Sequence, residues 1–286
     1  MAYVTREEML EVFRDTEEFC KTDENLKQSI RDSIKGTVFY GAKDYPPMPA
    51  RRFKKTVVSV AKRRTFDAAI AMQRKYLELR IAVHNFASAT NPGGGVKYGS
   101  RAQEEALCRC STLYPVLNTD ANWKNFYSVN RERRNPLHDD ACIYTPEITV
   151  CKSDIDKPQR LPRDKWDLVD VITIAAPNLR ERPNNINNPG NDIPVNISDD
   201  ELFALHESRL RHMFTVVAHH GADIFVTGAF GCGAFQNNPE VVAQAYKKIL
   251  AEFDGCFKEV VFAIYCRPQE TINYDIFKTV LSKTKA

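Results

Sequence analysis

The sequence predicts an α/β protein in which a mostly parallel sheet is covered by helices on both faces, preceded by a helical extension. Two observations support this prediction. From residue 56 onward, short apolar runs of strand length alternate with longer amphipathic segments of helix length. Two of these runs end in glycine-rich segments, at 93–95 and 228–233, as expected for turns after buried strands. Strands that alternate with helices favour a parallel sheet, because a crossover helix returns the chain to the same end of the sheet.

The elements follow in order along the chain. The strands are predicted at 56–60, 79–85, 169–175, 224–227 and 259–265, and the helices at 65–76, 100–114, 202–220, 239–253 and 273–282. Ser100-Arg101-Ala102-Gln103 is typical of a capping box, and Pro115 is expected to stop the helix that starts there. Asn238 and Pro239 mark another helix start.

Three parts of the chain depart from this alternation. Thr5 and Glu8 form a capping-box pattern before a first helix, a second helix is predicted from residue 22, and three prolines follow within 41–49. We therefore place a boundary between an N-terminal helical extension, 1–50, and a main domain, 51–286. Residues 118–165 are predicted to be irregular with short strands near 141–144, and 178–199 a long surface loop, either a lid or an insertion.

Composition limits the possible partners. The formal net charge is only +3, so the chain lacks the basic field of most nucleic-acid binders, and no direct nucleic-acid binding is expected. Local basic clusters at 51–55, 62–64 and 131–134 are either solvated faces or a means of attracting a polyanionic polymer.

The chain also lacks membrane and metal signals. No run approaches the roughly 18 apolar residues of a membrane span, and the first residues show no signal-peptide pattern. Eight cysteines without C-x-x-C spacing indicate reduced thiols, so an intracellular, cytoplasmic protein is expected, or a nuclear one if the source is eukaryotic. No cluster has metal-ligand spacing, so we expect neither a metal nor a cofactor.

The segment 91–107 carries the strongest functional signal. It contains Gly93, Gly94 and Gly95, and then Gln103-Glu104-Glu105 at a predicted helix start. Glycine lets backbone N–H groups approach a phosphate or a sugar closely, and adjacent carboxylates suit acid chemistry on a glycosidic bond. The simpler interpretation is that glutamates in a first helical turn stabilise the helix dipole and stay in water.

A second glycine-rich segment, 228–237, follows a predicted buried strand and precedes a helix, where N–H groups and the dipole favour a diphosphate. The alternative is a tight structural turn. The spacing Gly228-x-x-Gly231-x-Gly233 is not the dinucleotide-binding G-x-G-x-x-G, so a Rossmann fold is not expected.

The first segment resembles the signature of poly(ADP-ribose) glycohydrolases, in which Gly-Gly-Gly is followed a few residues later by Gln-Glu-Glu. The flanking residues 85–89 and 107–115 are similar to those of the compact microbial-type branch. The resemblance covers about residues 55–285. It implies a macrodomain-like three-layer α/β/α sandwich that binds ADP-ribose, with the second loop holding the diphosphate.

The resemblance also implies roles for single residues. Glu105 corresponds to the catalytic acid and Glu104 to the residue that positions substrate hydroxyls. Phe235 corresponds to an aromatic beside the ribose. Adenine is expected near the last strand–helix junction, where Asn273, Tyr274 and Phe277 are candidates, with core packing as the simpler role for Phe277. The expected substrate-binding set is Asn91, Gly93, Gly94, Gly95, Gln103, Gly228, Gly231, Cys232, Gly233, Ala234, Phe235 and Asn273.

The implied function is hydrolysis of the ribose–ribose O-glycosidic bonds of poly(ADP-ribose), which releases ADP-ribose. Poly(ADP-ribose), ADP-ribose and ADP-ribosylated proteins are the implied partners. Two alternatives stay open: a module that binds ADP-ribose without cleaving it, against which the intact Glu104–Glu105 pair argues, and a hydrolase of mono-ADP-ribosylated protein. Cleavage of internal bonds as well as chain ends is also open. Replacing Gly94 or Gly233 with Val is expected to weaken ADP-ribose binding and leave the melting temperature largely intact.

Overall fold

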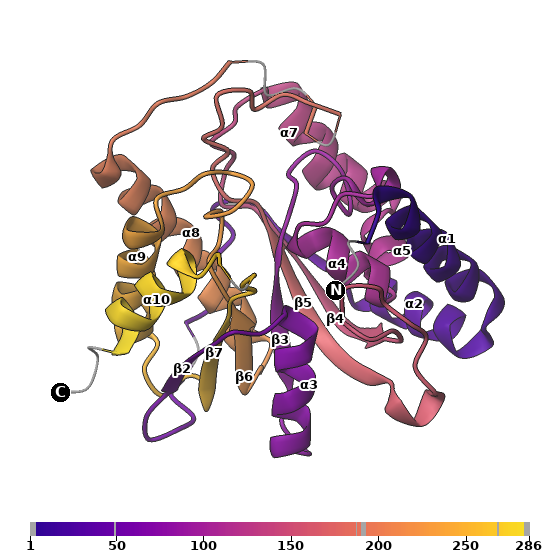
Figure 1. Ribbon diagram of the computed structural model, residues 1–286. Coiled ribbons are helices and arrows are strands. Elements are labelled where there is room, and N and C mark those ends of the chain that lie inside the picture. The colour runs from indigo at the N-terminus through magenta and orange to yellow at the C-terminus, as the bar shows by residue number, and fades with distance from the viewer. Residues whose placement is uncertain (1–3, 49, 187, 190–192, 268, 283–286) are drawn as a thin grey trace.

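The computed structural model describes residues 4–48, 50–186, 188–189, 193–267 and 269–282. It confirms the predicted fold class: a seven-stranded mixed sheet lies between two layers of helices (Figure 1). The strand order is β1-β4-β5-β3-β6-β7-β2, and the pairings from β5 through β3, β6 and β7 to β2 are all parallel. The strands are β1 Val38–Tyr40, β2 Val57–Ala61, β3 Ile81–Phe86, β4 Cys142–Val150, β5 Asp167–Ile174, β6 Ile224–Thr227 and β7 Glu259–Ala263.

Each face of the sheet buries its own apolar core. On one face, side chains of β5, β6 and β7 pack with α8, α9 and α10, and on the other they pack with α1, α3, α4 and α5 (Figure 1). The α-helices are α1 Arg6–Thr22, α2 Glu24–Gly36, α3 Thr65–Lys75, α4 Gln103–Cys110, α5 Leu113–Leu117, α6 Asp120–Asn122, α7 Ser128–Arg133, α8 Asp199–His219, α9 Pro239–Glu252 and α10 Ile272–Ser282. Two short 3-10 helices, η1 Val96–Tyr98 and η3 Arg163–Lys165, and one π-helix, η2 Trp123–Tyr127, complete the helical segments described.

The predicted helix at 100–114 is the main local error. The helix α4 starts only at Gln103, its N-cap Ala102 makes no side-chain cap, and the expected capping box at Ser100 is absent. The helix α4 ends at Cys110, because the carbonyl of this residue accepts hydrogen bonds from the N–H groups of Cys151 and Lys152 instead of from a following turn. Pro115 does not end a helix but lies in the first turn of α5, where its missing N–H leaves no bond unmade.

The segment 118–165 is more regular than predicted. It contains β4, a nine-residue strand that pairs antiparallel with both β1 and β5. The register shifts between Thr145 and Ile148, and Glu147 takes a positive φ of 54°. This bulge at Pro146 and Glu147 interrupts the alternation that identifies a strand, which is why the prediction found only its first residues.

The N-terminal helices pack directly on the rest of the chain. Phe13 of α1 lies edge-on to Tyr114, with ring centroids 5.0 Å apart, and the buried ammonium of Lys152 donates a 2.8 Å hydrogen bond to the carbonyl of Val12. The strand β1, which follows α2, extends the sheet. The boundary near residue 50 stays a prediction, and Pro49 lies outside the described residues.

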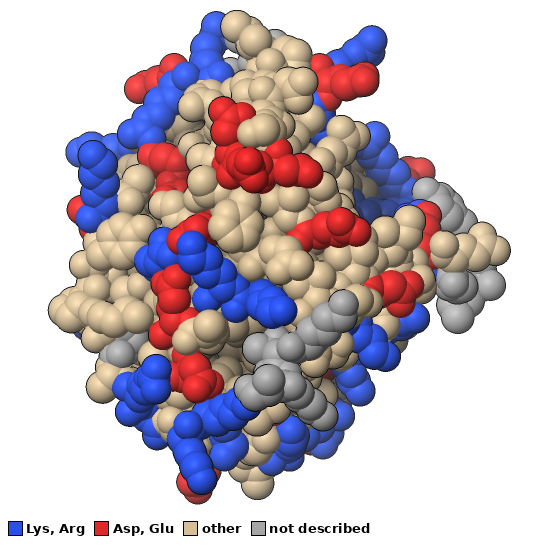
Figure 2. Space-filling view, turned by 90° about the vertical axis from the view of Figure 1, so that its left-hand side faces the viewer, with Lys and Arg blue, Asp and Glu red and all other residues tan. Residues whose placement is uncertain are grey.

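Charge is mixed over the surface. On the face that carries α9 and α10, basic side chains gather along the lower edge, and further basic side chains lie among acidic and uncharged ones at the centre and along the upper left edge (Figure 2). No helix in the described ranges combines the length and apolar character that a membrane span requires.

Candidate active site

The two glycine-rich segments meet because their strands are neighbours. Strand β3 ends at Phe86 and leads into the first segment, and β6 ends at Thr227 and leads into the second. These two strands pair in parallel, with Ala82 opposite Phe225, so both segments leave the sheet at the same edge. In parallel sheets this edge, at the carboxyl ends of the strands, is the usual place of a ligand site.

Glu104 is buried and held by several donors. Its side chain is 3% exposed, Oε2 accepts a 2.7 Å hydrogen bond from the N–H of Ser88, and Oε1 accepts a 3.2 Å hydrogen bond from Nδ2 of Asn85. Burial and the adjacent Glu105 raise the pKa of Glu104 well above its usual value, while the N–H of Ser88 opposes the rise. The expectation of a solvated first-turn glutamate is therefore wrong for this residue.

Glu105 is also buried, but its two oxygens differ. Its side chain is 6% exposed, and Oε1 accepts a 2.9 Å hydrogen bond from the N–H of Gly95. Its Oε2 accepts no hydrogen bond from any described residue. Burial raises the pKa of Glu105, and the hydrogen bond from Gly95 opposes this. A carboxyl group with one fixed oxygen and one free oxygen, kept from water, is suited to carry a proton.

Gly94 is the glycine nearest to the carboxylates. Its φ is +55°, and a Cβ at this position would come within 2.7 Å of Oε1 of Glu105 and 3.0 Å of Oε2 of Glu104. No side chain fits there. The expectation that Gly94→Val would leave the unliganded protein largely intact does not fit this geometry.

The segment 178–198 contacts the first glycine loop. Ser88 Oγ donates a 2.9 Å hydrogen bond to Oδ1 of Asn188, and Nδ2 of Asn91 donates one of 3.3 Å to the carbonyl of Ile186. Arg131 also binds this loop, since its Nε donates a 2.8 Å hydrogen bond to the carbonyl of Thr90. Asn91 thus connects the loop to its surroundings and does not line the cavity described next.

A cavity of about 1010 Å³ joins the two loops, which is the upper end of the volumes that ligand sites have. It is lined by nine of the fourteen residues predicted for the site: Gly94, Gln103, Glu104, Glu105, Gly231, Gly233, Ala234, Phe235 and Asn273. The other five, Asn91, Gly93, Gly95, Gly228 and Cys232, do not line it. Gly95 nevertheless acts on the site through its bond to Glu105, whereas a Cβ on Gly228 would lie 2.5 Å from the carbonyl oxygen of Ala263, which indicates a packing role.

The second loop offers open backbone at one place. A Cβ added to Gly233 would meet no atom within 4 Å, so this glycine faces free space in the cavity. Phe235 lines the same cavity, and the guanidinium of Arg180 lies 5.9 Å from the centre of its ring. Phe277, the third adenine candidate, is fully buried in the core, and Tyr274 does not line the cavity.

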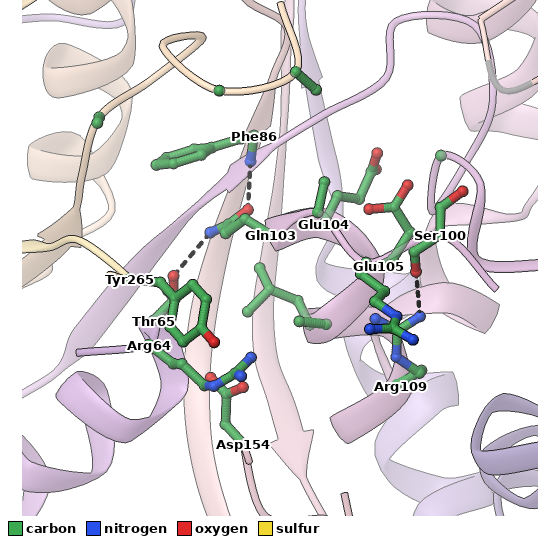
Figure 3. Close-up of a pocket in the computed structure, with 18 of the residues that line it drawn as sticks. Arg64, Thr65, Phe86, Ser100, Gln103, Glu104, Glu105, Arg109, Asp154 and Tyr265 are labelled. Carbon is green, nitrogen blue, oxygen red and sulfur yellow. Dashed lines mark hydrogen bonds between the residues drawn. The ribbon is translucent and has the colours of Figure 1, made fainter. Parts of the chain in front are cut away.

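Gln103 links the helix α4 to the sheet. Its Oε1 accepts a 2.9 Å hydrogen bond from the N–H of Phe86, and its Nε2 donates to Oγ1 of Thr65 and to the carbonyl of His84 (Figure 3). With both ends of its amide used, Gln103 fixes the start of α4, and therefore the two glutamates that follow it.

Several further residues that line the cavity were not predicted from the sequence. Arg64 lies over the ring of Tyr265, 4.2 Å from its centre, and forms an ion pair with Asp156. Asp154 is 8% exposed, accepts a 3.0 Å hydrogen bond from the N–H of Phe66, and has one oxygen without a partner in the described chain. Arg109 also lines the cavity, on the side of α4 opposite Thr65 and Tyr265 (Figure 3). Arg109 belongs to the same helix as the two glutamates, whereas Arg64, Asp154 and Tyr265 come from separate segments that only the fold brings to the cavity.

The described ranges contain no group of three or more His, Cys, Asp or Glu side chains placed to hold a metal ion.

Comparisons with known proteins agree with this geometry. The family model described as "Microbial-type PARG, catalytic domain", where PARG is poly(ADP-ribose) glycohydrolase, matches residues 7–153. The solved structure of PARG from Thermomonospora curvata matches with a TM-score of 0.81 at 26% sequence identity, over 95% of this chain and 98% of that chain. The same organism's PARG bound to the inhibitor ADP-HPD matches with a TM-score of 0.78 at 26% identity, over 96% and 99%.

PARG from Deinococcus radiodurans in complex with ADP-ribose matches with a TM-score of 0.73 at 30% identity, over 89% of this chain and 97% of that chain. A comparison with curated proteins gave no match.

Proposed function

Because the chain belongs to the microbial-type poly(ADP-ribose) glycohydrolase family, we propose that it hydrolyses the ribose–ribose O-glycosidic bonds of poly(ADP-ribose) and releases ADP-ribose. One observation carries the proposal beyond the family. A buried carboxyl group, Glu105, with an oxygen that no described residue binds, lies on the wall of a cavity that both glycine-rich loops line.

The terminal ADP-ribose unit binds with its diphosphate against the second loop. There the open backbone at Gly233 and Ala234 leaves room for phosphate oxygens beside N–H groups. The distal ribose lies between Phe235 and the first loop, and Glu104 accepts hydrogen bonds from its hydroxyls. Adenine lies at the end of the cavity where Tyr265 and Asn273 are found. The likeness to a PARG solved in complex with ADP-ribose supports this arrangement.

Glu105 then acts as the acid. The C1″–O bond of the distal ribose breaks, the proton of Glu105 goes to the leaving 2′-oxygen, and the charge that develops on the ribose is oxocarbenium-like. The resulting carboxylate takes a proton from water, whose oxygen bonds to C1″, and Glu105 is protonated again. Burial raises the pKa of both Glu104 and Glu105, so the pair retains a proton, which in this scheme Glu105 delivers to the leaving oxygen.

This scheme uses one carboxyl group for both proton transfers, whereas most glycosidases divide the work between two. The fixed position of Glu105 makes this possible. Gly95 binds one oxygen from the loop side, so the other oxygen stays at one place in the cavity during both steps.

Two defined substrates test the proposal. The protein is incubated with poly(ADP-ribose) and, separately, with a protein that carries single ADP-ribose units, and released ADP-ribose is measured by chromatography. We expect release from the polymer. Binding of ADP-ribose without release from either substrate would make the chain a reader, and release from the mono-modified protein alone would make it a hydrolase of protein-linked ADP-ribose. Either result would overturn the proposal.

A further inference from the structure

The cavity continues past the proposed acid. Beyond Glu105 it is lined by the start of α1, through Val4, Arg6 and Met9, by the loop 99–102, and by Arg109 of α4. Figure 3 shows Phe86, Thr65 and Tyr265 on one side of the first turn of α4, and Ser100 and Arg109 on the other. The cavity therefore has a second end, opposite the one that the second glycine loop lines.

Arg109 is the unusual residue at this end. It is only 3% exposed, and of its three nitrogens only Nη1 donates to an acceptor in the described chain, the carbonyl of Ser100 at 2.6 Å. Its charged neighbour is Glu105, one turn earlier on α4, whose carboxyl group interacts electrostatically with the guanidinium. When Glu105 carries the proton that it donates in the proposed scheme, this neighbour is uncharged, and a buried guanidinium then favours an anion supplied by a ligand. A planar guanidinium is also the side chain that best matches phosphate oxygens.

Further positive charge surrounds Arg109. The exposed side chains of Arg6 and Arg101 line the same end of the cavity, and Nε of Arg6 donates to the carbonyl of Tyr98. The acidic groups nearby have partners of their own: Asp156 pairs with Arg64, and Glu8 pairs with Lys157 at 2.8 Å. Asp154, across the cavity, is buried against the start of α3. This end of the cavity therefore carries a surplus of cations.

We propose that this end of the cavity is a subsite for the 5′-diphosphate of the ADP-ribose unit on the leaving side of the scissile bond. The inference rests on the proposed function. If Glu105 protonates the leaving 2′-oxygen, the first unit fills the end near Phe235 and the second unit has to extend from Glu105 in the other direction. The leaving 2′-oxygen and the 5′-diphosphate belong to one adenosine, so the anion site has to lie about one sugar away from the acid.

The helix α4 provides this spacing between the acid and the anion site. Arg109 is four residues after Glu105, one helical turn along α4, which corresponds to a rise of about 6 Å. The backbone therefore fixes the spacing between the acid and the anion site. The subsite would hold the second unit so that its 2′-oxygen faces Glu105, and it would favour a polymer over a single ADP-ribose joined to a protein.

The experiment measures binding without turnover. The protein is first saturated with ADP-ribose, which fills the end near Phe235, and is then titrated with ADP, which carries the adenosine and the diphosphate of the leaving unit. Calorimetry at low salt should show one ADP bound beside ADP-ribose. The double variant Arg6→Gln/Arg101→Gln should bind this ADP at least tenfold more weakly, and Arg109→Lys, which keeps the charge and loses the planar group, should also weaken it. Arg14→Gln, an exposed arginine of α1 outside the cavity, is the matched control.

Three results would overturn the subsite: no ADP binding to the saturated protein, displacement of ADP-ribose by ADP, or equal ADP affinity in the double variant and in Arg14→Gln. Poly(ADP-ribose) turnover by the wild-type protein is measured in the same preparation. If turnover is present and ADP binding is absent, the subsite fails and the proposed function stands. If ADP binds as expected and turnover is absent, the proposed function fails and the anion site stands.

Discussion

The backbone N–H of Gly95 donates a 2.9 Å hydrogen bond to Oε1 of Glu105, so the last glycine of the triplet holds the proposed acid in place. The bond occupies one carboxyl oxygen and leaves the other, Oε2, without a partner in the described chain. The glycine loop therefore serves two purposes: it closes over the carboxylates, and it decides which oxygen of Glu105 can give up a proton.

The first prediction concerns Glu105→Gln. Glutamine keeps the acceptor for the N–H of Gly95 and places an amide at the position of Oε2, which cannot protonate a leaving oxygen. The rate of poly(ADP-ribose) hydrolysis should fall by at least about 10²-fold, the low end of what general acid catalysis contributes. Affinity for ADP-ribose, measured by calorimetry, should change little, because the second loop is unchanged. A folded variant that binds ADP-ribose and cleaves polymer at a near-normal rate would contradict the assignment.

The second prediction concerns Glu104→Gln. Glu104 accepts hydrogen bonds on both oxygens, from Ser88 and Asn85. In the glutamine variant an amide NH2 group replaces one of these oxygens and faces a donor, so one hydrogen bond is lost. We expect weaker ADP-ribose binding and a lower rate together. The loss of a negative neighbour should also lower the pKa of Glu105, so the pH at which kcat/KM declines on the alkaline side should move downward. A pH profile identical to that of the wild-type protein would mean that the two carboxyl groups do not interact.

Much of the fold could be predicted because most strands and helices carry their own local pattern. The run 224–227 coincides with β6, and Pro239 marks the start of α9. The strand β4 was largely missed because Pro146 and Glu147 form a bulge in its middle. The break after Cys110 depends on N–H groups of residues 151 and 152, which no pattern within 100–114 reveals.

For the candidate site, the sequence predicts the residues that lie in short motifs and does not predict how other side chains pack around them. Glu104, Glu105 and the glycines lie in short motifs, so their proximity follows from chain connectivity. Arg109 belongs to the same helix, but its burial is visible only in the packed structure. Nor does the sequence distinguish the glycines from one another: Gly94 has no room for a side chain, whereas Gly233 faces open space.

The third prediction compares these two glycines. Gly94→Ala forces an L side chain into a left-handed conformation, which costs about 1–2 kcal/mol, and pushes Cβ toward the carboxylates. Its melting temperature should fall by several degrees and its activity should be lost. Gly233→Val meets no neighbouring atom, so its melting temperature should stay close to that of the wild-type protein while ADP-ribose binding weakens. Thermal melts and calorimetry on both variants decide the matter; equal losses of stability would show that the two loops have the same structural role.

The last prediction concerns the pH dependence of stability. Burial raises the pKa of Glu105 above the value of about 4.3 that a glutamate has in the unfolded chain. The folded state then holds the proton more tightly than the unfolded state. The stability that this contributes is fully present below the unfolded pKa and is lost as the pH rises through the folded pKa. Gln at position 105 cannot titrate, so the variant does not undergo this loss.

The difference in melting temperature, Glu105→Gln minus wild type, should therefore become more positive between pH 4 and pH 8. Removing the charge of Glu105 also relieves Glu104, whose raised pKa has Glu105 among its causes, and this acts in the same direction. Melts in buffers of equal ionic strength measure the difference, with Glu132→Gln, an exposed glutamate outside the cavity, as control. A difference that stays constant with pH, or that becomes more negative, would show that Glu105 is ionised in the folded protein as readily as in the unfolded chain. In that case it would have no proton to give at neutral pH.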